Sequence, residues 1–205
     1  MTQPRQFTGD TLVIATHNKG KVPEIAALLK DHVQNFPSAG ELGLGEPEET
    51  ETTYIGNAVL KARAAALASG LPALADDSGV SVEGLGGDPG VYSARWAGPG
   101  KDFTVAMERV RLGLEASPDR KGDRAAFICA LALAWPDGHV EAVEGRLEGK
   151  VSFPARGTNG FGYDPIFIAD GYDITCGEMD PALKHAISHR SNAFAKLKAR
   201  CFTGS

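Results

Sequence analysis

Two adjacent carboxylates, Asp76 and Asp77, follow a short apolar run and precede Ser78 and Gly79. The run at residues 71–75 is typical of a buried strand and predicts that both carboxylates lie at its end. Adjacent ionised carboxylates repel each other and are tolerated there only where a cation or hydrogen-bond donors neutralise them. Oxygen ligands suit magnesium, which one or two carboxylates often hold together with substrate phosphates, so the pattern indicates a magnesium site. A solvated acidic turn that caps a helix is the alternative.

A phosphate-binding segment is predicted at residues 16–21, between a predicted strand and a predicted helix. A helix N-terminus offers unpaired backbone N–H groups and a partial positive charge, Gly20 permits close approach, and Lys21 adds a full charge. An oligophosphate could be cradled here, although the glycine spacing of a Walker loop is missing. An ordinary strand-to-helix turn, capped by Thr16 or Asn18, is the alternative.

A ring that could stack on a base occurs at Phe161, which stands between Gly160 and Gly162. Flanking glycines expose an aromatic side chain on a loop, and the nearby Asp164 could accept hydrogen bonds. A tight turn with a core aromatic is the alternative.

A further anion site is predicted where Lys184 is followed by Ser188, His189 and Arg190 at the start of a helix. Two or three positive donors near a helix N-terminus suit an anion, and Arg190 can bind phosphate or carbonyl oxygens through two N–H groups. A capped helix with solvated basic residues is the alternative.

Apolar runs alternate with helical patterns along the chain, which is typical of an α/β protein. Strands are expected at residues 12–15, 71–75, 125–135, 139–145 and 165–169, and the segment 80–85 follows the second of these as a separate piece. Residues 136–138 are expected to form the turn of a hairpin. Helices are expected at residues 22–29, 53–69, 103–112 and 188–199.

The composition limits the partners and the compartment. The 205 residues, 42% of them hydrophobic, fit one domain over residues 1–205 with two lobes. A formal charge of −5 gives no basic surface for a nucleic-acid backbone or an anionic membrane, so neither partner is expected. Three cysteines without metal-ligand spacing, a polar N-terminal stretch and the lack of a membrane-length apolar run favour a cytoplasmic protein.

Seven separated segments together resemble the inosine/xanthosine triphosphate pyrophosphatase family. They occur in the family's order across almost the whole chain. Any one of them could arise by chance, whereas seven in the same order are specific. The segments are residues 16–21, 48–50, 57–62, 75–79, 86–95, 161–165 and 187–190.

The resemblance implies a magnesium-dependent pyrophosphohydrolase. Such an enzyme converts ITP, dITP and XTP to the nucleoside monophosphate and pyrophosphate, and so removes deaminated purines from the nucleotide pool. The resemblance also implies an α/β fold of two lobes around a long mixed β-sheet, with the substrate in a central cleft, and a homodimer as the assembly. Positioning and electrostatic stabilisation would carry the catalysis, so no covalent intermediate is needed.

Roles toward the phosphates and the metal follow from the same resemblance. Glu48 and Asp77 would coordinate magnesium, with Glu49 as the alternative to Glu48, and Asp77, alone or with Asp76, would orient or deprotonate the attacking water. Ser78 would touch the phosphates or the sugar. The triphosphate would be held by Thr16, His17, Asn18, Lys19, Gly20 and Lys21, and its charge neutralised by Lys61 and Lys184.

Toward the base, the resemblance implies that His189 and Arg190 donate hydrogen bonds to the 6-oxo group. A donor aimed at that position pairs with a carbonyl oxygen but meets another donor at the amino group of adenine, so adenine is rejected. Guanine shares the 6-oxo group and must be rejected at the 2-position, by a residue that the sequence does not identify. Phe161 would be the stacking platform, and the base would be surrounded by Phe161, Gly162, Tyr163 and Asp164.

Two other functions remain open at this stage. A nucleotide pyrophosphatase of the septum-inhibitor type has a similar structure and another base specificity, but the segments 161–164 and 188–190 argue against it. A non-catalytic nucleotide-binding module would not need Asp77, so Asp77→Asn would leave its ligand affinity and its biological effect intact.

Overall fold

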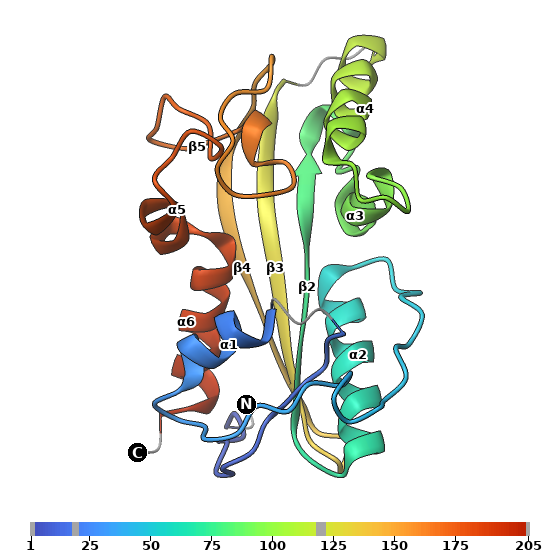
Figure 1. Ribbon diagram of the computed structural model, residues 1–205, viewed down its shortest axis with the longest axis vertical. Helices are drawn as coiled ribbons and strands as arrows, with labels where there is room; N and C mark the ends of the chain where they lie inside the picture. Colours follow the sequence, from blue (N-terminus) through green and yellow to red (C-terminus); the bar gives the residue numbers. More distant parts are fainter. Residues whose placement is uncertain (1–2, 18–20, 118–121, 204–205) are drawn as a thin grey trace. The chain divides into compact units, whose positions relative to one another are not determined.

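The structure is a computed structural model that describes residues 3–17, 21–117 and 122–203 of the chain. Its five strands form one sheet in the order β1-β2-β3-β4-β5, in which β2, β3 and β4 are the long strands (Figure 1). The strands of the described residues are β1 (Val13–Ile14), β2 (Ala73–Val82), β3 (Arg124–Ala134), β4 (Val140–Val151) and β5 (Phe167–Ala169). The helices there are α1 (Lys21–Leu29), α2 (Tyr54–Ser69), α3 (Ser93–Trp96), α4 (Phe103–Ala116), α5 (Pro181–Ile187) and α6 (His189–Cys201).

The sheet is mixed. Strand β1 runs parallel to β2, with Val13 opposite Ala73, whereas β4 and β5 are antiparallel, with Val151 opposite Phe167. The predicted hairpin between β3 and β4 is also present, because the Trp135 N–H donates to the His139 backbone oxygen and the Gly138 N–H donates to the Trp135 backbone oxygen across the turn. These pairings confirm the predicted α/β fold with a mixed β-sheet.

The chain divides into two compact units. The first unit comprises Met1–Asp77, Ala130–Glu144 and Ala193–Ser205, and the second comprises Ser78–Cys129 and Gly145–Asn192. Strands β2, β3 and β4 each contribute residues to both units. Within the described residues, no helix combines the length and the apolar character needed to cross a membrane.

The first unit is built around α2 and its neighbour β1. Helix α2 begins after Thr53, whose side chain accepts a hydrogen bond from the Gly56 N–H, and it ends at Gly70, which has a φ of 70°. Both boundaries match the prediction, since hydroxyl N-caps and left-handed C-terminal glycines are the usual helix signals. The buried face of α2 is mostly alanine, which lets the helix lie close to its neighbours; it includes Ala58, Ala62, Ala65 and Ala66.

The second unit has its own hydrophobic core. Helix α4 turns Ala106 and Val110, four residues apart, into this core, as an amphipathic helix does. Phe127 of β3 and Phe167 of β5 pack ring against ring, with centroids 4.1 Å apart. Partly buried side chains close the core, among them Phe103 and Met107 of α4.

The strand that carries the two aspartates differs from the prediction. The sequence pattern ends this strand at residue 75 and treats 80–85 as a separate piece, but β2 runs without a break from Ala73 to Val82. That prediction was wrong because lysines on α1 and α2 neutralise the two carboxylates, so the strand continues through them. Gly79 keeps β2 regular at a crowded point, since a Cβ there would lie 2.5 Å from the Ser93 Oγ and 2.6 Å from the Gly90 oxygen.

Other elements extend beyond their predicted ends. Strand β4 and helix α4 continue to Val151 and Ala116, several residues past the predicted boundaries. Helix α5 was not predicted, although its start carries a recognisable signal. The Asp180 side chain caps it by accepting hydrogen bonds from the N–H groups of Ala182 and Leu183. Pro181 occupies the first helical position.

Candidate active site

Asp76 and Asp77 are adjacent in β2, yet each has its own cationic partner. Successive residues of a strand point to opposite faces, which separates the two carboxylates. Lys21, the first residue of α1, donates from Nζ to both carboxylate oxygens of Asp76 at 2.9 Å. The Nζ of Lys61 lies 3.6 Å from Oδ1 of Asp77. Two ion pairs therefore offset the cost of burying two adjacent carboxylates.

Helix α2 supplies the partners of Asp77. Asn57 and Lys61 are four residues apart and so share one face of the helix. Asn57 is only 1% exposed; its Nδ2 donates to Asp77 Oδ2 at 3.3 Å, and its Oδ1 accepts from the backbone N–H of Glu51 at 3.0 Å. The Asn57 amide thus links Asp77 to the loop that precedes α2.

That loop contains Glu48 and Glu49, the two alternative magnesium ligands of the sequence analysis. The Nζ of Lys61 donates to Oε1 of Glu49 at 2.5 Å, so Glu49 joins the cluster of Lys61 and Asp77. Glu48 is exposed. Of the two neighbours, Glu49 is the one that the structure places beside Asp77.

The surroundings of Asp77 bring the pKa of its carboxylate close to neutral pH. Burial, first of all, raises the pKa of Asp77 to about 6, and the charges of Glu49 and Asp76 act in the same direction. Lys61 and the Asn57 amide act in the opposite direction. A carboxylate with a pKa near neutrality is suited to proton transfer with water, which makes Asp77 the candidate general base.

Lys61 remains a cation in this site. Burial alone would lower its pKa, but the charges of Asp77 and Glu49, with the hydrogen bond to Glu49, outweigh burial and raise it. One ammonium group therefore pairs with two carboxylates, Glu49 and Asp77. Because the two carboxylates are not fully neutralised by it, the cluster can bind a further cation.

The predicted phosphate-binding segment is only partly described. Asn18, Lys19 and Gly20 lie outside the described residues. Lys21 opens α1, at the end of the segment, and pairs with Asp76. Thr16 is half-buried two residues after β1, and its backbone oxygen accepts a hydrogen bond from Gly40.

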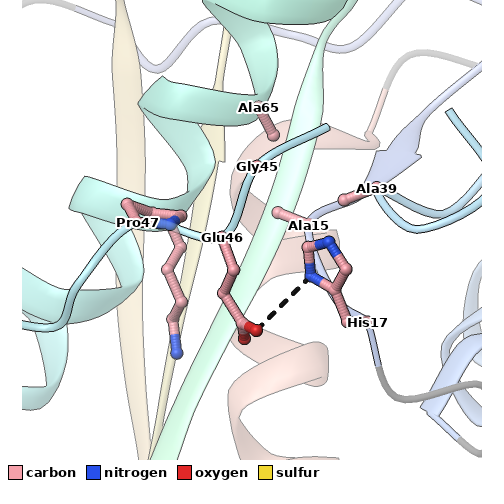
Figure 2. Close-up of a pocket in the computed structure, with 8 residues that line it drawn as sticks. Ala15, His17, Ala39, Gly45, Glu46, Pro47 and Ala65 are labelled. Carbon is pink, nitrogen blue, oxygen red and sulfur yellow. Dashed lines mark ion pairs between the residues drawn. The ribbon is translucent and has the colours of Figure 1, made fainter. Parts of the chain in front are cut away.

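His17 faces a loop of the same unit. Its Nε2 lies 2.9 Å from the backbone oxygen of Leu44, and its Nδ1 lies 3.6 Å from Oε2 of Glu46. Figure 2 shows the imidazole and the Glu46 carboxylate directed at each other. They border a small pocket whose lining also includes Ala15, Ala39, Gly45, Pro47, Lys61 and Ala65.

The donor set of the first unit fits a magnesium ion that is completed by substrate. Within the described residues, no group of three or more histidine, cysteine or acidic side chains could hold a metal ion by itself. Asp77 and one glutamate of the preceding loop offer two carboxylates, and magnesium is usually held by one or two carboxylates plus phosphate oxygens. A cation would also relieve the charge repulsion that contributes to the raised pKa of Asp77.

The second unit begins at Ser78, which follows Asp77 directly in β2. The Oγ of Ser78 is buried and makes no hydrogen bond within the described part of the chain. Buried hydroxyl groups are normally paired, so an unpaired one is a candidate ligand contact.

The glycine-flanked aromatic loop also lies in the second unit. Phe161 is 71% exposed, which excludes the alternative of a core aromatic. Asp164 organises the loop from within, because its Oδ2 accepts from the Phe161 N–H and from the Lys184 Nζ, both at 2.8 Å. Gly160 has a φ of 73°, and a Cβ there would lie 2.1 Å from the Asp164 Oδ2, so the turn requires glycine.

Tyr163 and the start of α6 complete the predicted set in this unit. Tyr163 is buried and donates its hydroxyl proton to the Ser93 backbone oxygen at 2.8 Å. Ser188 caps α6 by accepting from the Ser191 N–H at 3.1 Å. The His189 ring stacks on Phe127, with centroids 5.2 Å apart and planes 26° apart, while Arg190 is half-buried in the first turn.

Three supporting residues were given no role from the sequence. Asn57 stands four residues before Lys61, and this helical spacing could have indicated its position near Asp77. Phe127 and Phe103 contact His189 and Phe161 respectively. These two contacts join segments far apart in the sequence, and no local pattern indicates them.

Comparisons with known proteins agree with the resemblance seen in the sequence. The sequence model of the Ham1 family matches residues 12–200. A dITP/XTP pyrophosphatase of Rhodospirillum centenum is 72% identical over 202 residues, which cover 98% of this chain and 100% of the relative. A dITP/XTP pyrophosphatase of Caulobacter vibrioides is 62% identical over 196 residues, which cover 95% of this chain and 99% of the relative. The structure of a HAM1 protein from Coxiella burnetii matches with a TM-score of 0.86 at 39% identity, covering 92% of this chain and 96% of that one. The chain belongs to the Ham1 family.

Proposed function

We propose that this protein is a pyrophosphohydrolase that converts dITP, ITP and XTP to the nucleoside monophosphate and pyrophosphate. Two relatives that match over nearly their whole length carry the name dITP/XTP pyrophosphatase, which supports the assignment. The observation that carries the chemistry is Asp77, a buried carboxylate with a pKa of about 6 beside Lys61 and Glu49. Removal of deaminated purines from the nucleotide pool is the expected biological role.

Hydrolysis would use Asp77 as the residue that orients the attacking water and accepts its proton. Its pKa suits this task, since at pH 7 most of the carboxylate is ionised and still basic enough to take a proton. Lys61 would offset the charge on the phosphates, and Asn57 would hold the carboxylate in place through its Nδ2. Residues 16–21 would bind the triphosphate.

Magnesium is the proposed cofactor, held by Asp77 and by Glu48 or Glu49. When bound, it would neutralise charge on the phosphates and on the pyrophosphate leaving group. Glu49 is favoured over Glu48, because it lies in the cluster with Lys61 and Asp77 while Glu48 is exposed.

Base recognition is assigned to residues of the second unit. Phe161 would stack on the purine, supported by Gly162, Tyr163 and Asp164. His189 and Arg190 would donate to the 6-oxo group and so reject adenine. Ser78 would use its unpaired hydroxyl toward the phosphates or the sugar. Lys184 would add positive charge from its position beside Asp164.

A homodimeric, cytoplasmic enzyme is part of the proposal. The net charge of −5 supports a small-molecule substrate rather than a nucleic acid or a membrane. A septum-inhibitor-type pyrophosphatase with another base specificity is the weaker alternative, because the curated relatives named above act on dITP and XTP.

The experiment that tests this function measures pyrophosphate release from ITP, dITP, XTP, ATP and GTP, each with and without magnesium. Fast release confined to the first three substrates and to the magnesium-containing reactions is expected. Equal rates on ATP and GTP would contradict the base specificity, and release without magnesium would contradict the cofactor.

Asp77→Asn separates an enzyme from a binding module when pyrophosphate release and ITP binding are both measured. We expect this variant to bind ITP and to release no pyrophosphate above background. Retained turnover in the Asp77→Asn protein would remove Asp77 from the proposed chemistry.

A further inference from the structure

Phe161 is exposed, but its ring contacts the ring of Phe103. The ring centroid lies 5.7 Å from that of Phe103, and the two planes meet at 86°, an edge-to-face contact. In this geometry one ring presents its edge to a face of the other, so at least one face of Phe161 stays uncovered by Phe103. The contact therefore restrains the ring and leaves a face for stacking.

Phe103 is itself well anchored in the second unit. It is the first residue of α4, directly after Asp102, whose Oδ1 accepts from the Thr104 N–H at 2.9 Å. Its ring also meets the buried Tyr163 edge to face, with centroids 5.6 Å apart. Tyr163 is fixed in turn by its hydrogen bond to Ser93. A continuous line of aromatic contacts runs from the core to Phe161.

The backbone of the loop does not restrain the Phe161 ring by itself. The hydrogen bond from the Phe161 N–H to Asp164 fixes the main chain, but it leaves the side-chain torsions free. Gly160 and Gly162, which flank the ring, have no side chains to pack against it. Within the part of the chain that the structure describes, Phe103 is the aromatic neighbour of Phe161 that can select one ring orientation.

We propose that Phe103 is a positioning residue that holds the Phe161 ring ready to stack on the purine base. The inference rests on the proposed function, in which Phe161 is the stacking platform. Preorganisation of this kind lowers the ordering cost of binding, so its loss weakens substrate binding and leaves the hydrolytic step intact.

Phe103→Leu tests the proposal, because leucine keeps apolar bulk over the core and removes the edge-to-face contact. The KM for ITP is expected to rise about two- to ten-fold, the usual range for such an aromatic pair, with kcat nearly unchanged. Inhibition by pyrophosphate, which lacks a base, should stay the same. Phe103→Tyr should restore the wild-type KM. Phe103→Met provides a second aliphatic replacement if the leucine variant does not fold.

A double-mutant cycle with Phe161→Ala distinguishes positioning from core packing. Adding Phe103→Leu to Phe161→Ala should change the KM no further, because the ring that Phe103 positions is gone. Met107→Ala, on the same helix and against the same core, is the control and should leave the KM unchanged. An equal effect of Phe103→Leu with and without Phe161, or an equal effect of Met107→Ala, would overturn the inference.

Failure of the proposed function has a different signature. If Phe161→Ala leaves the KM for ITP unchanged, the stacking role is wrong and the inference falls with it. If Phe161→Ala raises the KM while Phe103→Leu does not, only the inference is overturned.

Discussion

The Lys61 ammonium lies 3.6 Å from the Asp77 carboxylate, and the two side chains come from α2 and β2 of the same unit. Lys61 is shared, since its Nζ also pairs with Glu49. A cation divided between two carboxylates does not fully compensate the burial of either one, which explains why the pKa of Asp77 is raised although a lysine lies beside it. The arrangement leaves Asp77 reactive.

Asp77→Asn is expected to stabilise the metal-free protein at neutral pH. The raised pKa means that the native state binds this proton more tightly than the unfolded state, so the wild type loses stability as pH rises from about 4 to about 6. Each pH unit between the two pKa values corresponds to about 1.4 kcal/mol, which gives a gain of roughly 2–3 kcal/mol for the variant at pH 7. Urea unfolding at pH 4 and pH 7 without divalent ions measures it.

The control for this comparison is Asp31→Asn, which changes an exposed aspartate of the same unit. It should follow the wild type at both pH values. If the free energy of unfolding of the Asp77→Asn protein changes with pH as that of the wild type does, the pKa of Asp77 is not raised in the native state.

Lys61→Met is expected to have the opposite effect on stability. Methionine keeps most of the apolar stem but leaves Asp77 and Glu49 as neighbouring carboxylates without the ammonium between them. We expect a loss of about 2–4 kcal/mol at pH 7, typical of breaking a largely buried ion pair. The loss should shrink at pH 5, because protonation of Asp77 then removes the repulsion. Denaturant unfolding of Lys61→Met is compared with that of Lys30→Met, a control at an exposed lysine. A loss of stability that does not change with pH would contradict the role of Asp77 in the repulsion.

The sequence predicted those parts of the site that local patterns encode. Thr53 and Gly70 mark the ends of α2 because capping is a local signal, and the α2 face that carries Lys61 follows from helical spacing. The choice between Glu48 and Glu49 could not be predicted, since it depends on how an irregular loop folds against Lys61. The continuation of β2 through Asp76 and Asp77 was also beyond local patterns, because the neutralising lysines lie on helices elsewhere in the chain.

Glu141 links three segments of the first unit, and Glu141→Gln tests how much these contacts contribute to the free energy of unfolding. This carboxylate is 5% exposed and accepts from the Arg5 N–H, from the Arg200 Nε and from the His139 Nε2, at 3.1, 2.5 and 2.9 Å. Burial would raise the pKa of Glu141, but these donors outweigh burial and lower it. The stabilisation is therefore present above the unfolded pKa and is lost as pH falls through the native one.

Glu141→Gln is expected to cost about 1–3 kcal/mol at pH 7 and progressively less below about pH 4. Glu144→Gln on the same strand serves as the control for a neutralised β4 glutamate. Thermal unfolding across this pH range checks the prediction, and a constant difference between wild type and variant would show that the ionised carboxylate is not what stabilises the unit.

Gly56→Ala tests whether the geometry around Asn57 supports the site. Alanine normally stabilises a helix by up to about 1 kcal/mol relative to glycine. Here a Cβ would lie 2.8 Å from the Glu51 Cβ and 2.9 Å from the Thr53 Oγ1, so both must move. Movement of Glu51 disturbs the hydrogen bond from its N–H to Asn57, the residue that holds Asp77. We therefore expect no gain in stability and a lower kcat for ITP.

Gly113→Ala in α4 is the matched control for that variant. A Cβ at this helical glycine would lie 3.0 Å from Leu85 Cδ2, the end of a flexible side chain that can move aside. The control should gain some helix stability and keep the wild-type kcat, because neither Gly113 nor Leu85 is among the residues that hold Asp77. Thermal unfolding and ITP turnover of both variants, measured side by side, decide the outcome. A Gly56→Ala protein that is both more stable and fully active would show that the link from Glu51 through Asn57 to Asp77 is dispensable.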